Sequence, residues 1–116
     1  MMIVTRALGF SVTAPIRERV ESRFRSASGP SDGRVMIVTA RLEDVNADSG
    51  GIDKRCRLVA GLRESGVVIA EATDADLYVA IDRAASRLRR AAVEATRRQV
   101  ARDRRHPLGR RVLAGV

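Results

Sequence analysis

The sequence predicts an α+β fold, a two-layer β-α-β-β-β-α sandwich in which two helices cover one face of a four-stranded sheet. Short β-branched segments are separated by turn residues in the middle of the chain, and two other segments carry apolar residues at helical spacing. Three consecutive strands joined by short turns form an antiparallel meander. Because each helix has one apolar face, both helices are expected to pack on the same side of the sheet.

The N-terminal part is expected to form a strand followed by a helix. Residues 2–8 are β-branched or apolar and end at a glycine, as in a short strand. Thr13 is a candidate helix N-cap, and Pro15 lies in the first turn, where its missing N–H has no cost. The helix is expected to continue to about residue 26. Its apolar face is marked by Ile16, Val20 and Phe24.

Three strands follow a Gly-, Pro- and Ser-rich connector. They are expected at residues 34–44, 52–63 and 67–72, with turn residues at 45–51 and 64–66. The middle strand alternates clearly. One face carries Ile52, Cys56, Leu58, Ala60 and Leu62, and the other carries Asp53, Arg55, Arg57 and Arg63.

The last element is a long helix with two distinct sides. Thr73, Asp74 and Asp76 are candidate capping residues, and Thr73 with Asp76 fits a capping box. The apolar side consists of Leu77, Ile81, Ala84, Leu88, Ala91 and Ala95. The basic side consists of Arg83, Arg87, Arg90, Arg97 and Arg98. A helix from about residue 74 to 102 would be about 40 Å long. The domain is therefore expected to span residues 1–102, and residues 103–116 to form a flexible basic tail.

The composition favours a polyanionic partner. The 116 residues carry a formal net charge of +8, and every basic residue except Lys54 is arginine. Such a balance fits nucleic acid or an anionic surface, although arginines on a solvated surface are the simpler alternative. The single cysteine, Cys56, excludes an internal disulfide, and no apolar run is long enough to span a membrane. A cytoplasmic protein is expected.

No catalytic constellation is found in the sequence. The only histidine, His106, falls in the expected tail, and Cys56 occupies the apolar face of a strand. No set of His, Cys and carboxylates has metal-ligand spacing. We therefore expect no enzyme activity, no metal and no cofactor. The arginine side of the long helix is left as the candidate functional surface, because arginine pairs bidentately with phosphate.

Two segments resemble the ribosome hibernation-promoting factors and ribosome-associated translation inhibitors, also called sigma-54 modulation proteins. The segment EATDADLYVAIDRAASRLRR has the family's acidic turn followed by Asp76, Leu77 and Tyr78 and then by an Ala-Ile-Asp group. The segment VTAPIRERVESRF is similar to the family's first helix. The resemblance covers residues 2–99 and corresponds to the short form of the family. Unlike most members, this chain has Glu94 and Thr96 where the basic run usually continues.

The resemblance implies a protein that occupies the mRNA and tRNA channel of the small ribosomal subunit and inhibits translation during stress or stationary phase. No membrane and no small-molecule substrate are implied. Basic family positions that contact ribosomal RNA match Arg23, Arg87 and Arg90, and the spacing along the long helix extends this set to Arg83, Arg89, Arg97 and Arg98.

A protein-interaction module is the alternative interpretation. The uncovered sheet face would then bind a protein partner or a second copy of the chain, as a homodimer. The residues expected on that face are Arg55, Arg57, Val59 and Ile69.

Overall fold

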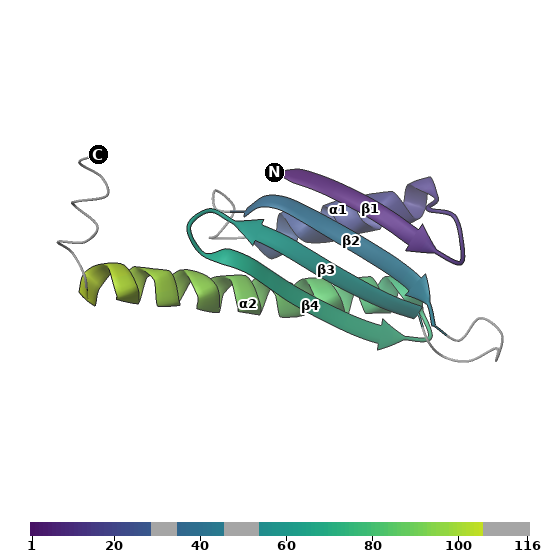
Figure 1. Ribbon diagram of the computed structural model, residues 1–116. Coiled ribbons are helices and arrows are strands. Elements are labelled where there is room, and N and C mark those ends of the chain that lie inside the picture. The colour runs from purple at the N-terminus through teal and green to yellow at the C-terminus, as the bar shows by residue number, and fades with distance from the viewer. Residues whose placement is uncertain (29–34, 46–53, 106–116) are drawn as a thin grey trace.

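The computed structural model describes residues 1–28, 35–45 and 54–105, which form the predicted elements in the predicted order (Figure 1). The elements are β1 (Met2–Leu8), α1 (Ala14–Ser28), β2 (Val35–Asp44), β3 (Lys54–Leu62), β4 (Gly66–Asp74) and α2 (Leu77–Arg105). Residues 29–34, 46–53 and 106–116 lie outside the described residues, and they include most of the predicted connector at 26–33 and of the predicted turn at 45–51, together with Ile52, Asp53 and His106.

The four strands form one mixed sheet in the order β1-β2-β3-β4. Strands β2, β3 and β4 are antiparallel neighbours, which confirms the predicted meander. Strand β1 pairs with β2 in parallel, so α1 is the crossover helix that parallel neighbours require. At the β3–β4 turn, Glu64 and Gly66 both have positive φ angles, which confirms the tight turn predicted at 64–66.

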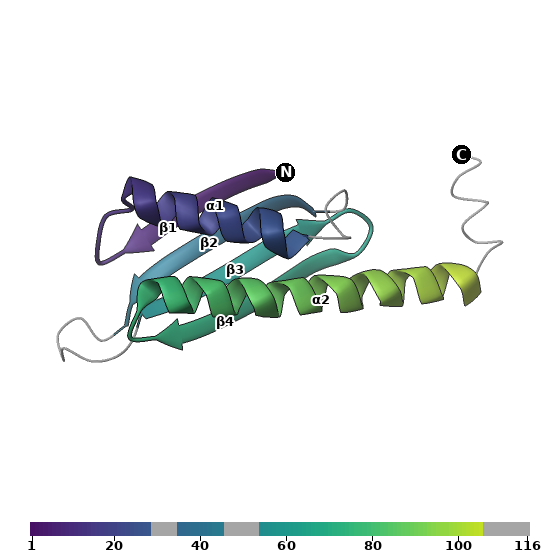
Figure 2. The ribbon, with the colours of Figure 1, turned by 180° about the vertical axis from the view of Figure 1, so that it is seen from behind.

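Both helices lie on the same face of the sheet, as predicted (Figure 2). Helix α2 packs on β3 and β4 and also contacts α1. The core between the two layers consists largely of aliphatic side chains and alanines. Its most deeply buried large side chains are Leu42, Leu58, Ile81, Val20 and Val38. The alternation predicted for the middle strand is confirmed, because Cys56, Leu58, Ala60 and Leu62 are all buried in this core.

The start of α2 differs from the prediction. Thr73 is part of β4, where it pairs with Arg55, and it does not cap the helix. Asp76 is the cap, because its Oδ1 accepts a hydrogen bond from the N–H of Tyr78 at 2.9 Å. Asp74 Oδ1 in turn accepts from the N–H of Asp76 at 3.0 Å. The strand pairing with β3 extends to Asp74 and therefore delays the first helical residue to Leu77.

Helix α2 extends beyond the sheet (Figures 1 and 2). Its last fully buried side chain is Ala92, whereas the predicted stripe residues Ala91 and Ala95 are only half-buried. The helix ends at Arg105 and so includes 103–105, which the sequence assigned to the tail. Its 29 residues correspond to about 43 Å. The C-terminal part of this basic helix is consequently reachable from several sides.

Candidate nucleic-acid interface

The outer surface of α2 carries the predicted arginines. The helix contains nine arginines and three acidic residues, a formal charge of +6. All six candidate positions on it are exposed, whereas Ala84, Leu88 and Ala92 on the same helix are buried. The six are Arg83, Arg87, Arg89, Arg90, Arg97 and Arg98. The predicted separation of α2 into an apolar and a basic side is therefore confirmed by its burial pattern.

Three of these arginines have no polar partner among the described residues. Arg89, Arg90 and Arg97 make neither a hydrogen bond nor an ion pair there, and they line a shallow hollow of about 650 Å³ along the helix. Ser86, Val93 and Glu94 complete the lining. An unpaired guanidinium keeps five N–H donors available in a planar fork. These three side chains are thus the best placed to receive an anionic ligand.

Two other arginines attach α2 to the sheet edge. Arg83 Nη1 lies 3.2 Å from Asp74 Oδ2, and Arg87 Nη1 donates a 2.6 Å hydrogen bond to the Glu71 carbonyl oxygen. Strand β4 is an edge strand, whose outward carbonyls have no strand partner. Arg87 satisfies one of these carbonyls. Both arginines therefore position the helix, while their exposed guanidinium groups still contribute positive charge to the surface.

Glu94 reduces the charge in the second half of the helix. Its Oε1 lies 3.5 Å from Nε of Arg98, and both side chains are more than half exposed. A solvent-exposed pair of this length contributes little to stability. An ion pair between Glu94 and Arg98 is thus present, whereas neither an ion pair nor a hydrogen bond joins Glu94 to Arg90 in the described part of the chain. Arg90 thus stays unpaired despite an acid four residues away.

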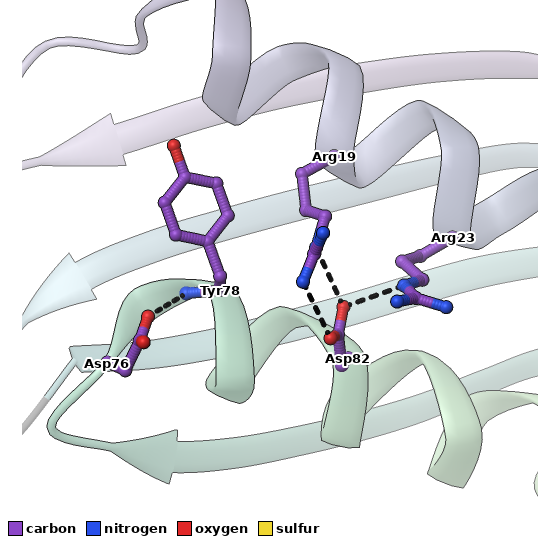
Figure 3. Close-up of polar contacts among 5 residues, drawn as sticks. All are labelled: Arg19, Arg23, Asp76, Tyr78 and Asp82. Carbon is purple, nitrogen blue, oxygen red and sulfur yellow. Dashed lines mark hydrogen bonds and ion pairs between the residues drawn. The ribbon is translucent and has the colours of Figure 1, made fainter.

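Helix α1 contributes a second group of arginines that meet one carboxylate on α2 (Figure 3). Arg19 binds Asp82 with both prongs of its fork, at 3.1 Å from Nε to Oδ1 and 3.0 Å from Nη2 to Oδ2. Arg23 donates from Nε to Asp82 Oδ1 at 2.8 Å. The Arg19 guanidinium also lies 5.4 Å from the ring centre of Tyr78. This cluster joins the two helices.

Arg23 differs from the unpaired arginines of α2 because it already has a carboxylate partner. It lies on the surface of the first helix, as predicted, but the carboxylate of Asp82 partly neutralises its charge. Arg19, its partner in the cluster, was not among the predicted site residues. The spacing of Arg19 and Arg23 by four residues on one helix face was the signal that could have identified it. Which carboxylate they share depends on the packing of α1 beside α2, which the sequence pattern does not specify.

The predicted sheet-face residues lie on the uncovered face. Arg57, Val59 and Ile69 are half-buried or exposed and alternate with buried core residues along β3 and β4, so they lie on the side opposite both helices. Arg55 is less available, because its Nη2 donates a 2.6 Å hydrogen bond to Glu43 Oε2. This hydrogen bond and the charge of Glu43 raise the pKa of Arg55. Beside it, Lys54 forms an ion pair with Asp44.

No group of three or more His, Cys, Asp or Glu side chains that could hold a metal ion is found within residues 1–28, 35–45 and 54–105. In the same residues, no helix is long and apolar enough to cross a membrane. Cys56 is fully buried, and its burial raises the pKa of the thiol to about 12. The neutral thiol is therefore part of the core.

We expect the Cys56 thiol to be inert towards a disulfide reagent such as DTNB at pH 8 until the protein unfolds, because the thiolate is the reactive form. The free energy of unfolding should also depend on this thiol. Its folded pKa is raised from 9.0 to about 12, so the folded state holds the proton more tightly. The resulting stabilisation is present below pH 9 and is lost as the pH rises towards 12, at up to about 1.4 kcal/mol per pH unit.

Denaturant titrations of the natural chain and of Cys56→Ala at pH 8 and pH 11 measure this effect. The stability of the natural chain should fall more steeply with pH than that of the variant. If the free energy of unfolding falls equally with pH in both proteins, or if the native thiol reacts rapidly with DTNB at pH 8, the thiol is accessible in the folded state.

Comparisons with known proteins agree with the fold. Residues 3–102 match the family described as sigma 54 modulation protein / S30EA ribosomal protein. The N-terminal domain of Protein Y from Thermus thermophilus is 28% identical, with a TM-score of 0.64 over 78% of this chain and 91% of that domain. A ribosomal subunit interface protein from Coxiella burnetii is 16% identical and has the same fold, with a TM-score of 0.73 over 83% of this chain and 98% of that one. No curated protein matches the sequence.

Proposed function

Because the chain belongs to the family of sigma 54 modulation proteins and S30EA ribosomal proteins, we propose that it binds the small ribosomal subunit and inhibits translation. The family is ribosome-associated and is not an enzyme family. The proposed site is the mRNA and tRNA channel, and the proposed setting is the cytoplasm during stress or stationary phase. Arginines on α2 and α1 would contact the phosphates of ribosomal RNA.

The unpaired state of Arg89, Arg90 and Arg97 is the observation that carries this proposal. An arginine already paired with a carboxylate has part of its charge neutralised and some of its donors occupied, whereas these three need lose only water. The surface has no tryptophan, and Tyr78 lies beneath Arg19. Recognition would therefore depend on shape and phosphate contacts rather than on bases stacked against aromatic rings, as is common for structured RNA.

Co-sedimentation with purified small and large ribosomal subunits tests the proposal. We expect binding to the small subunit with strong salt dependence, because each phosphate contact releases counterions. About four contacts would lower the affinity on the order of 100-fold between 50 and 200 mM salt. Addition of the protein to a cell-free translation reaction should reduce synthesis in proportion to the subunits bound. Absence of association at 50 mM salt would exclude the proposed function.

Neutralising Asp82 should change stability and RNA affinity in opposite directions. The substitution Asp82→Asn removes the carboxylate that Arg19 and Arg23 share, so the folded state should lose about 1 kcal/mol. It also frees two guanidinium groups, and the affinity for the small subunit should rise several-fold at low salt. Thermal melting and co-sedimentation measure the two effects. Reduced affinity would instead indicate that the cluster is needed to hold α1 in its binding position.

A further inference from the structure

The uncovered face of the sheet carries side chains in rows that run across the strands. The strand register places Arg6 beside Arg41, Arg41 beside Arg57, and Arg57 beside Glu71. The next row consists of Val4, Thr39, Val59 and Ile69, and the row beyond it of Met2, Ile37, Gly61 and Val67. On the other side of the basic row lies a mixed row of Leu8, Glu43, Arg55 and Thr73. The face thus carries a mixed row, a basic row and two largely apolar rows.

The three arginines of the basic row, Arg6, Arg41 and Arg57, have no hydrogen-bond or ion-pair partner among the described residues. Neighbouring strands are about 4.8 Å apart, so like charges in adjacent positions repel one another and destabilise the sheet. The same three side chains line a hollow of about 480 Å³ together with Val4, Ile37 and Val59. A ligand that supplied negative charge along this row would relieve the repulsion.

The side chains of the two apolar rows are unusually exposed, because adjoining apolar side chains on a monomer are normally better covered. Val67 is 65% exposed, Met2 62% and Ile69 52%. Contiguous exposed apolar side chains generally indicate a protein-interaction surface. No helix covers this face in the part of the chain that the structure describes (Figure 1). The three rows contain arginine and no lysine, and arginine is enriched in protein interfaces whereas lysine is depleted.

We propose that this face binds an acidic amphipathic segment of another protein, most simply a helix that lies across the strands. Adjacent rows are two residues apart, about 6.6 Å, so the three rows cover about 13 Å. An α-helix with its side chains is about 10–12 Å wide. Its apolar side would lie on the two apolar rows, while glutamate or aspartate along one flank would pair with Arg6, Arg41 and Arg57. This site lies on the opposite side of the sheet from the proposed ribosome-binding surface.

Charge complementarity and side-chain composition favour this occupant over two alternatives, a second copy of the chain and single-stranded RNA. Two copies packed through it would bring six unpaired arginines together with only two Glu71 side chains, since each Glu43 already binds Arg55. Single-stranded RNA bound on a sheet typically stacks its bases on aromatic rings, and these three rows contain none. RNA would also leave the apolar rows uncovered.

A synthetic 18-residue helical peptide, with leucines along one side and glutamates along one flank, serves as the probe. Titrated into the full isotope-labelled chain at 50 mM salt, it should shift the amide resonances of β1, β2 and β3 residues on the open face. We expect Arg41→Glu and Arg57→Glu each to weaken binding at least tenfold. Arg63→Glu, at an exposed position in the turn directly after β3, makes the same charge change outside the rows and should have little effect.

The inference is overturned if the peptide causes no shifts at millimolar concentration, or if a peptide of the same composition in scrambled order binds equally well. If the natural chain binds oligouridine and Arg41→Glu does not, the face binds RNA instead. If the natural chain forms a concentration-dependent dimer that Arg41→Glu does not form, the face binds a second copy instead. Arg41→Gln and Arg57→Gln provide neutral variants if a glutamate variant does not fold. Co-sedimentation with the small subunit is measured on the same variants, so failure of this inference is separable from failure of the ribosome-binding proposal.

Discussion

Reversing the charge of Arg90 and Arg97 together should lower the affinity for the small ribosomal subunit about 100-fold, or about tenfold for each side chain. Both guanidinium groups are exposed and unpaired among the described residues, so neither substitution removes a contact within the fold. The melting temperature should therefore stay within about 2 °C of that of the natural chain. Equilibrium binding at two salt concentrations and thermal melting measure the two quantities. The salt dependence of the double variant should be weaker, because two counterion-releasing contacts are lost.

Arg63→Glu is the matched control for each single reversal. It changes the net charge by the same amount, but it lies at the end of the β3–β4 hairpin and not on α2. If Arg63→Glu weakens binding as much as Arg90→Glu does, the effect is one of total charge and the outer surface of α2 has no special role. Arg87 is a less suitable target than Arg90, because its reversal also removes the hydrogen bond to the Glu71 carbonyl oxygen.

The layers of this fold were predictable because they depend on local signals. Turn residues separate the strands, and two segments repeat their apolar residues at helical spacing. The signals around Thr73 were ambiguous, since Thr73, Asp74 and Asp76 could each accept a hydrogen bond from the first helical turn. Continued pairing of β4 with β3 decided among them, and the cap is Asp76. Pairing between strands is a tertiary effect that no local pattern contains.

The candidate site was predictable as a surface but not as a set of contacts. The spacing placed Arg83, Arg87 and Arg90 on the exposed side of α2, which the structure confirms. That Arg87 reaches a carbonyl of an edge strand depends on the distance between α2 and β4. The row of Arg6, Arg41 and Arg57 depends on the parallel pairing of β1 with β2. These residues are far apart in sequence, so only the register brings them together.

Replacing Ile81 with alanine should lower the stability and leave the affinity for the small subunit unchanged, which is the opposite of the result expected for the reversal of Arg90 and Arg97. Ile81 is 1% exposed and fixes α2 in the core, so its truncation should cost about 2–5 kcal/mol of unfolding free energy. That cost is a large fraction of the stability of a domain of this size. Urea titrations should show a lower midpoint with an unchanged slope, because the surface exposed on unfolding stays nearly the same. Ile81→Val should cost only about 0.5–1.5 kcal/mol.

Val100→Ala is the control within the same helix, since Val100 is only half-buried and lies in the segment of α2 after the last buried core residue. It should change stability by less than about 0.5 kcal/mol. At a temperature where Ile81→Ala remains folded, its affinity for the small subunit should equal that of the natural chain, because the exposed arginines are intact. An affinity loss in folded Ile81→Ala comparable to that of the arginine variants would mean that binding requires the exact seating of α2 on the sheet. Equal affinity would locate binding in the charged outer surface alone, with the core serving only to present it.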